Sequence, residues 1–389
     1  MLIVQAKIYT MAAAGVIDRG YVRLENGRIE SCGPMDRLDR RPGEETVDLH
    51  GALCLPGFVD AHTHLGMWED SLDFEGDDGN EDTDPVTPHL RAIDAINPMD
   101  RCFTEALEAG VTTVLTGPGS ANPIAGQFAA LKTSGRRVED MILRAPVAMK
   151  FALGENPKTT YHGKSQAPVT RMAIAALIRE QLEKARRYGE QLAAAAADPE
   201  LDKPEYDAKC EALLPVLRRE LKAHFHAHRA DDIFTAIRIS KEFGLDYVII
   251  HGTSGYQAAD LLAAEGCGVL SGPLLCDRSK PELGDLTPAS AGRLAAAGVP
   301  TAIITDHPVI PIQYLGLCAG LAVREGMAYE AALAAVTIQA ARICGIADRV
   351  GSIEPGKDGD LAIFAEDPLT LSAKPLLVFC AGKKVVDRR

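Results

Sequence analysis

Apolar runs that end in a side chain able to bind metal recur along this chain, with helical stretches between them. The first run, residues 55–65, contains His62 and His64 near its end. Later runs end at or near Lys150, His226, His251 and Asp306. Strands that alternate with helices predict a parallel sheet, and in a closed parallel barrel every strand opens on the same face at its carboxyl end. The sequence therefore predicts an α/β fold, a TIM-type (β/α)8 barrel with these side chains at one end.

The spacing of His62 and His64 is that of a metal clamp. Side chains alternate along a strand, so residues i and i+2 point the same way and two imidazoles can converge on one cation. Two partly buried histidines without a metal would give the same spacing, but the later strands favour the metal. Imidazole nitrogens and carboxylate oxygens are the usual ligands of Zn²⁺, which lowers the pKa of a bound water toward neutrality.

Eight barrel strands are expected from the alternation of strand and helix patterns. Their expected ends are His64, Gly117, Lys132, Lys150, His228, Gly252, Leu275 and Asp306. Helices are expected at about 231–243, 256–264 and 288–297. The stretch 166–221 is rich in alanine, leucine, glutamate and arginine, and it predicts two helices in the connection from the fourth strand to the fifth.

Both ends of the chain have strand character. Residues 1–52 contain an Asn26-Gly27 pair, which is typical of a β-hairpin turn, and residues 351–389 contain a second turn at Gly382. Neither segment is long enough to form a sheet with its own core. We therefore predict that they pair into one small β-sandwich beside a barrel domain of residues 53–350.

Composition limits the function classes. The 389 residues, 47% of them hydrophobic, suffice for one large core and a small second module. The net charge of -13 disfavours nucleic acid as a partner and favours a small-molecule substrate. The sequence lacks the pattern of a secretory signal and any uncharged stretch long enough to span a bilayer, so we expect a cytoplasmic protein without membrane attachment. The nine cysteines have no paired spacing, which fits a reducing compartment.

Three segments, residues 56–64, 109–114 and 351–363, occur together with the His and Asp strand ends. With them the chain resembles the amidohydrolase superfamily, and most of all its imidazolonepropionase-like branch. The resemblance implies a metal-dependent hydrolase in which Asp306 both binds metal and shuttles a proton. It implies four histidine ligands, which are His62, His64, His226 and His251. Homo-oligomers are common in the family, and no feature of this sequence fixes the oligomeric state.

Lys150 separates two versions of this site. In binuclear amidohydrolases a lysine at the end of strand four is carbamylated by carbon dioxide and becomes a bridging carboxylate, and mononuclear relatives lack this bridge. We expect the site to bind a divalent metal, with Zn²⁺ as the favoured ion. Two ions per chain are expected if Lys150 is carbamylated, and one if it is not. The alternative is a lysine that pairs with Glu155 or with an acidic group of the substrate.

The strand-five ligand is not fixed by spacing alone, because His224, His226 and His228 share one strand face. The family motif favours His226 as the metal ligand and leaves His224 for the core. Substrate contacts are expected from His228 and from the loop after strand four, through Glu155 and Asn156. The acidic segment 66–85 follows strand one and would lie over the site, either as a lid for cationic substrates or as a solvated loop.

The resemblance implies hydrolysis of a C–N bond in a small amide, of dipeptide-like, N-acyl or cyclic type. The alternatives are a metal-dependent deaminase or lactonase, or a non-catalytic scaffold relative. Imidazolone propionate is not the favoured substrate, because imidazolonepropionases usually carry an acidic residue soon after the strand-five histidine, where this chain has Arg229 after His228.

Overall fold

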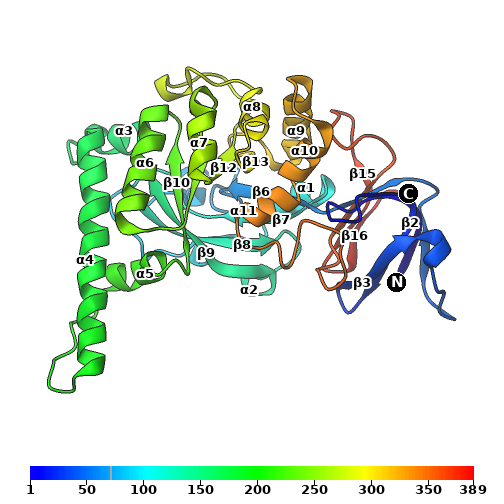
Figure 1. The fold of residues 1–389 in the computed structure, drawn as a ribbon, viewed down its shortest axis with the longest axis horizontal. Helices are drawn as coiled ribbons and strands as arrows, with labels where there is room; N and C mark the ends of the chain where they lie inside the picture. The colour runs from blue at the N-terminus through cyan, green and yellow to red at the C-terminus, as the bar shows by residue number, and fades with distance from the viewer. Residues whose placement is uncertain (71) are drawn as a thin grey trace.

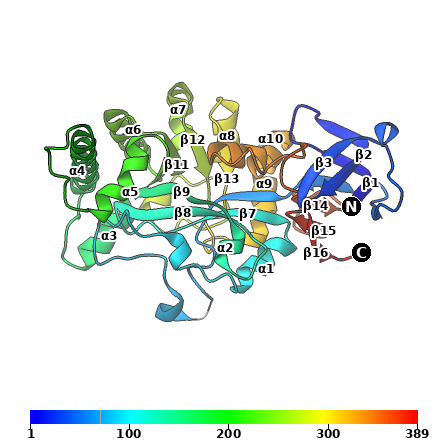
Figure 2. The ribbon, with the colours of Figure 1, turned by 90° about the horizontal axis from the view of Figure 1, so that it is seen from below.

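Two sheets make up the β-structure of the protein. The structure is a computed structural model that describes residues 1–70 and 72–389; Ser71, within the acidic segment 66–85, lies outside the described residues. One sheet is built by the middle of the chain and the other by both ends. Figure 1 shows the terminal sheet at one end of the molecule and the long helix α4 (Arg171–Ala197) at the other, and Figure 2 shows the same arrangement from below. The predicted fold class, a barrel beside a β-structure from both chain ends, is confirmed.

The barrel sheet contains eight strands in their order along the chain. They are β6 (Phe58–Thr63), β7 (Val111–Thr116), β8 (Ile124–Lys132), β9 (Ile142–Ala152), β10 (Lys222–Ala227), β11 (Tyr247–His251), β12 (Gly268–Ser271) and β13 (Thr301–Ile303). Backbone bonds between the segments that end β6 and follow β13 close the ring. The N–H of Asp306 donates to the carbonyl of His62 at 3.2 Å, and the N–H of His64 donates to that of His307 at 2.8 Å.

Helices and short 3-10 turns connect these strands. The α-helices other than α4 are α1 (Arg101–Glu108), α2 (Val138–Met141), α3 (Glu155–Gly163), α5 (Ala208–Leu217), α6 (Ala230–Phe243), α7 (Ala259–Glu265), α8 (Ser290–Ala296), α9 (Leu315–Arg324), α10 (Tyr329–Ala335) and α11 (Ile338–Ile343). The 3-10 helices are η1 (Met35–Arg37), η2 (Asp73–Gly76), η3 (Ala92–Asp94), η4 (Gly255–Ala258), η5 (Pro281–Leu283) and η6 (Ile312–Tyr314). The described helices include none with the combination of length and apolar composition that a membrane crossing requires.

The parallel half of the barrel follows the predicted alternation closely. Val248, Ile249 and Ile250 of β11 are all buried, because a parallel strand covered on both faces has no solvent side. Helix α6 matches the predicted span 231–243, with acidic residues in its first turn and Gly244 as a left-handed cap at φ 66°. The two helices predicted within 166–221 are α4 and α5. The chain leaves β12 at Ser271, earlier than the expected Leu275.

Strand β8 departs from the predicted topology. It pairs antiparallel with both β7 and β9, so Lys132 lies at the opposite end of the barrel from the other expected strand ends. The connection 117–123 between β7 and β8 contains no helix. A parallel crossover needs about a dozen residues or more, whereas antiparallel neighbours can be joined by a short turn. The strand ends at Lys132 as expected, but the prediction that it runs parallel to its neighbours was wrong.

The terminal sheet joins strands from both ends of the chain in the order β16-β15-β14-β5-β1-β2-β3, with β4 against β1. The strands are β1 (Leu2–Tyr9), β2 (Val16–Glu25), β3 (Arg28–Pro34), β4 (Thr46–Asp48), β5 (Leu53–Pro56), β14 (Leu361–Phe364), β15 (Pro375–Cys380) and β16 (Lys383–Asp387). Asn26 and Gly27 turn the predicted hairpin with φ of 50° and 80°. Ile3, Val22 and Phe379 belong to one buried cluster, so the two ends share a core.

A buried charge cluster joins the barrel to the terminal sheet. Lys132 Nζ lies 3.0 Å from a carboxylate oxygen of Asp358 and also contacts the Asp360 carboxylate. Arg349 pairs with Asp358 through two nitrogens at 2.8 and 2.9 Å. Burial opposes the charge of Lys132, but the two carboxylates hold its pKa above the usual value. The barrel and the terminal sheet are thus linked by ion pairs in which Lys132, Asp358 and Asp360 are buried and Arg349 is partly exposed.

Replacing Lys132 with methionine leaves two buried carboxylates without their shared cation. We expect the free energy of unfolding to fall by about 3–5 kcal/mol, measured by urea denaturation. Lys383 is an exposed lysine of β16, and Lys383→Met should change this free energy by no more than about 0.5 kcal/mol. Equal stability of the two variants would contradict the role given to the cluster.

Candidate metal centre

The residues that the sequence singled out as ligands converge in the barrel. Six residues do so from five strands or strand ends; they are His62, His64, Lys150, His226, His251 and Asp306. The four histidines and Lys150 are each at most 6% exposed. The structure therefore brings the whole predicted set together, and the role of each member as a ligand stays a prediction.

The first ligand group surrounds Asp306. One carboxylate oxygen of Asp306 lies 3.4 Å from Nε2 of both His62 and His64. Ligand-type atoms of His62, His251 and Asp306 lie within 4.8 Å of one another. Lys150 Nζ lies 3.1 Å from His62 Nε2, so the lysine adjoins this group directly.

A second group adds a residue that the sequence assigned to substrate. Ligand-type atoms of His226, His228 and His251 lie within 4.8 Å of one another. The His228 ring stacks on that of His251, with centroids 4.3 Å apart. His251 belongs to both groups, so it links them. His224 belongs to neither group and lies fully buried, with ring nitrogens that have no hydrogen-bond partner among the described residues.

Backbone carbonyls orient two of the imidazoles. His64 Nδ1 lies 2.7 Å from the carbonyl of Gly117, and His251 Nδ1 lies 2.7 Å from that of Gly272. A carbonyl can only accept, so each Nδ1 carries the hydrogen and donates it. The lone pair of each ring is therefore on Nε2, as it is in histidines that bind metal through this atom.

Two residues of the centre have an unusual backbone. His251 and Asp306 have φ of 72° and 56°, in the left-handed region that non-glycine residues rarely adopt. Each such residue costs on the order of 1–3 kcal/mol and persists only where its surroundings enforce it. Both lie where a strand has just ended, so the strain coincides with the turn of the chain away from the barrel.

Burial disfavours the charged form of several nitrogen donors. It lowers the pKa of His62, His226 and His228 well below the usual value, and neighbouring positive groups lower it further. Burial also lowers the pKa of Lys150 to about 7. Burial alone would raise the pKa of Asp306, but the surrounding histidines hold it well below the usual value. Neutral imidazoles with one carboxylate are a donor set that suits Zn²⁺ and similar ions.

A cavity of about 540 Å³ opens onto the centre. His64, His226, His228, His251 and Asp306 line it. The acidic segment 66–85 contributes Trp68 and Asn80 to its wall, and the Trp68 ring lies 4.6 Å from that of His64. Of the described residues of this segment, no carboxylate lines the cavity, which favours a solvated loop over a lid for cations.

Both predicted loop contacts, Glu155 and Asn156, also line the cavity. Asn156 Nδ2 lies 3.4 Å from His226 Nε2. The Glu155 carboxylate instead accepts a hydrogen bond from the backbone N–H of Glu282 at 3.0 Å, and Lys150 has no contact with it. The alternative in which Lys150 pairs with Glu155 is therefore wrong.

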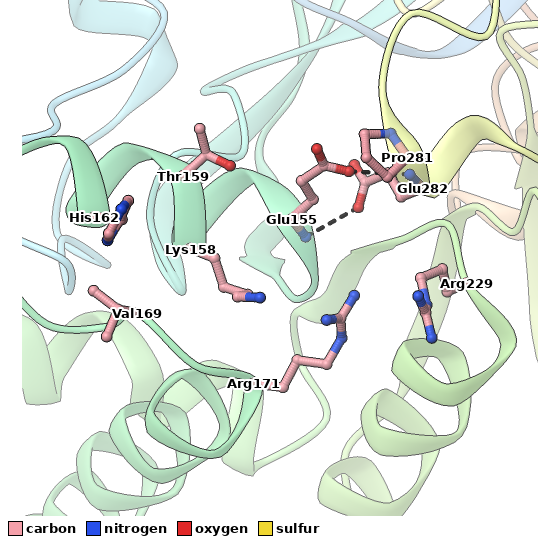
Figure 3. Close-up of a pocket in the computed structure, with 9 residues that line it drawn as sticks. All are labelled: Glu155, Lys158, Thr159, His162, Val169, Arg171, Arg229, Pro281 and Glu282. Carbon is pink, nitrogen blue, oxygen red and sulfur yellow. Dashed lines mark hydrogen bonds between the residues drawn. The ribbon is translucent and has the colours of Figure 1, made fainter.

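A second cavity, of about 460 Å³, lies on the other side of Glu155 and Glu282. Figure 3 shows these two residues joined by hydrogen bonds, with Lys158, Arg171 and Arg229 along the wall below them. Arg171 is paired with the Asp232 carboxylate at 2.9 Å, so part of this positive charge is already balanced.

Sequence reasoning missed Asp60, which links the backbone of His62 to Thr305 next to the candidate ligands. Its buried carboxylate accepts hydrogen bonds from the hydroxyl and backbone N–H of Thr305, at 2.5 and 3.2 Å, and from the N–H of His62 at 3.3 Å. Burial raises the pKa of Asp60 to about 7. Its position two residues before His62 was the available signal. Glu282 and Lys280, in the connection between β12 and β13, were also missed, and they stand far from any strand end in the sequence.

A barrel that gathers histidines, a lysine and an aspartate at its strand ends, beside a sheet from both chain termini, defines the amidohydrolase class. The model of the Amidohydrolase family matches residues 53–387, and the chain belongs to this family. The resemblance inferred from the sequence is thereby confirmed.

Relatives support the same placement. Amidohydrolase tasK of Hapsidospora irregularis is 28% identical over 95% of this chain, which spans only 40% of that relative's length. An imidazolonepropionase of Geobacillus kaustophilus is 27% identical over 91% of this chain and 85% of its own. The crystal structure of an amidohydrolase from Thermotoga maritima MSB8 matches with a TM-score of 0.95 and 41% identity, covering 100% of both chains.

Replacing His251 with alanine tests whether the two groups form one centre. Because His251 is common to both, we expect the variant to lose at least half of the metal bound per chain, measured by elemental analysis after purification without chelator. His50, whose side chain is 86% exposed, provides the control His50→Ala, which should keep its metal. Unchanged metal in His251→Ala would rule out the shared-ligand arrangement.

Proposed function

We propose that this protein hydrolyses a C–N bond of a small molecule with a metal-activated water. The observation that carries the proposal is the pair of buried ligand groups that share His251 and place Asp306 beside them. His62, His64 and Asp306 would hold metal on one side and His226 and His251 on the other. A bound divalent ion would polarise the scissile carbonyl and make the attacking water more acidic.

Asp306 is the group that would move the proton. Its carboxylate is ionised and faces the cavity, with a side chain 14% exposed. It would accept a proton from the attacking water and return that proton to the leaving nitrogen. His62 and His64, each 3.4 Å away, hold this carboxylate in place.

Lys150 supports a binuclear centre. A charged ammonium among the ligands would repel a cation, whereas a pKa of about 7 gives the lysine a substantial neutral fraction near pH 7. The neutral amine can add carbon dioxide and release a proton, which converts it to a carbamate anion. That anion would lie beside His62 and serve both metal positions.

The cavity supports a small amide as substrate. Its volume of about 540 Å³ accommodates a molecule of the size of a dipeptide, an N-acyl amino acid or a cyclic amide. Trp68 offers an aromatic surface, and Lys280 and Asn156 offer hydrogen-bond donors on the wall. These features favour a substrate with an apolar part and a polar or acidic part.

The imidazolonepropionase relatives favour a second candidate, hydrolysis of a cyclic amide or a deamination, at a centre with one ion. In this mononuclear centre Lys150 would remain unmodified. Arg229 after His228 differs from the acidic residue usual in imidazolonepropionases, so this candidate ranks second.

Metal analysis combined with a substrate panel tests the proposal. The panel contains dipeptides, N-acyl amino acids, cyclic amides and aminated heterocycles. We expect turnover of at least one amide class, loss of that turnover after chelation, and recovery when Zn²⁺ is added back. Protein with its full metal content that hydrolyses none of these compounds would overturn the proposal.

Replacing Asp306 with asparagine should remove the proton carrier. We expect metal content to be largely retained and kcat to fall by about 10²–10⁴-fold, measured by steady-state kinetics on the best panel substrate. Asp277, an exposed residue that also lines the cavity, provides the control Asp277→Asn, with kcat within a few-fold of the parent. Near-normal turnover in Asp306→Asn would remove Asp306 from the mechanism.

Replacing Lys150 with alanine should lower the metal content from two ions to one. Short carboxylic acids should restore part of it, because they can occupy the position of the carbamate. Intact-mass measurement under gentle conditions should show one added carbon dioxide on the parent and none on the variant. Lys158→Ala, a half-buried lysine of the neighbouring cavity, is the control. An unmodified parent with one ion would favour the mononuclear candidate.

A further inference from the structure

Glu282 brings a carboxylate to the histidine cluster from outside the barrel strands. It belongs to η5, in the connection between β12 and β13, and its side chain is only 1% exposed. One carboxylate oxygen, Oε1, lies 3.7 Å from His226 Nε2 and 3.6 Å from His228 Nε2. No other acidic side chain among the described residues has an ion-pair contact with either histidine.

These separations suit a shared ion better than direct hydrogen bonds. An N–H to oxygen hydrogen bond spans about 2.7–3.2 Å, so 3.6–3.7 Å is too long for one. Ligands at roughly 2.1 Å from a tetrahedral ion lie about 3.4 Å from one another. Oε1 comes close to that spacing from each of the two Nε2 atoms. Ligand-type atoms of His226, His228 and His251 also lie within 4.8 Å of one another.

The rest of Glu282 is fixed in a way that leaves Oε1 pointing at the histidines. Its other oxygen, Oε2, accepts a hydrogen bond from the Glu155 N–H at 3.0 Å, and the Glu155 carboxylate in turn accepts one from the Glu282 N–H at 3.0 Å (Figure 3). Lys280 Nζ lies 2.6 Å from Oε1 and donates to Asn156 Oδ1 at 2.8 Å. Lys280 is 29% exposed along its side chain, so this ammonium can turn toward solvent when a cation approaches Oε1.

We propose that Glu282, His226 and His228 form a cation-binding set that takes a divalent transition metal such as Zn²⁺. The proposal rests on the proposed metal-dependent function and extends it, because one ion of the centre is then held in part by the β12–β13 connection. His228 becomes a ligand rather than a substrate contact. The Glu155 backbone is the support that orients the new ligand.

Metal titration of Glu282→Gln tests the proposal. Glutamine keeps the shape and can still accept from the Glu155 N–H, but it lacks the charge. Glu155→Gln is the matched control, because it alters the other half of the same reciprocal pair and does not reach the histidines. Each protein, purified and stripped of metal, is titrated with Zn²⁺ against a chromogenic chelator, and the Co²⁺-loaded forms are compared by visible absorption.

We expect the parent to bind two ions, Glu282→Gln to bind one of them at least tenfold more weakly with an altered Co²⁺ spectrum, and Glu155→Gln to match the parent. Parental affinity and spectrum in Glu282→Gln would overturn the inference and leave the proposed function intact. Equal weakening in both variants would also overturn it, because Glu282 would then act through the shape of the loop. A parent that binds no metal would overturn the proposed function and this inference together.

Discussion

The closure of the barrel between β6 and the segment after β13 is the constraint on which the site depends. These segments come from opposite ends of the barrel sequence, yet His62, His64 and Asp306 must meet across this seam. Two backbone bonds and the buried Asp60 carboxylate, which accepts from Thr305 and from the N–H of His62, hold the seam together. A displacement here would separate the Asp306 oxygen from both imidazoles.

The barrel closure and the burial of the ligands together set the positions and protonation states of the donor atoms. Burial lowers the pKa of His62, His226, His228 and His251, so these imidazoles stay neutral. The carbonyls of Gly117 and Gly272 fix which nitrogen of His64 and of His251 carries the lone pair. The strained backbone at His251 and Asp306 is the cost of aiming both side chains at one point. Donor atoms set in this way need little rearrangement to receive a cation, which reduces the entropy lost on binding.

Much of this could be read from the sequence, because the barrel repeats one simple pattern. Apolar runs ending in His251 and Asp306, and the i, i+2 spacing of His62 and His64, located the site, since parallel strands open on one face. Strand β8 broke the pattern because a short connection reversed its direction, which the apolar run itself does not reveal. Glu282 had no signal, because its position depends on how a long connection folds back over the barrel. The spacing already placed His228 on the same strand face as His226, and three-dimensional packing shows that it lies with the possible ligands.

The terminal sheet has a consequence for the order in which the protein can assemble. Strand β5 pairs with β1 on one side and with β14 on the other, and β14 is made more than three hundred residues later. Until that final segment leaves the ribosome, β5 has an open edge and Lys132 lacks both of its carboxylate partners. The pairing of β5 is therefore completed only after the last segment of the chain is synthesised. Until then, the nascent chain exposes an unpaired strand edge to other molecules.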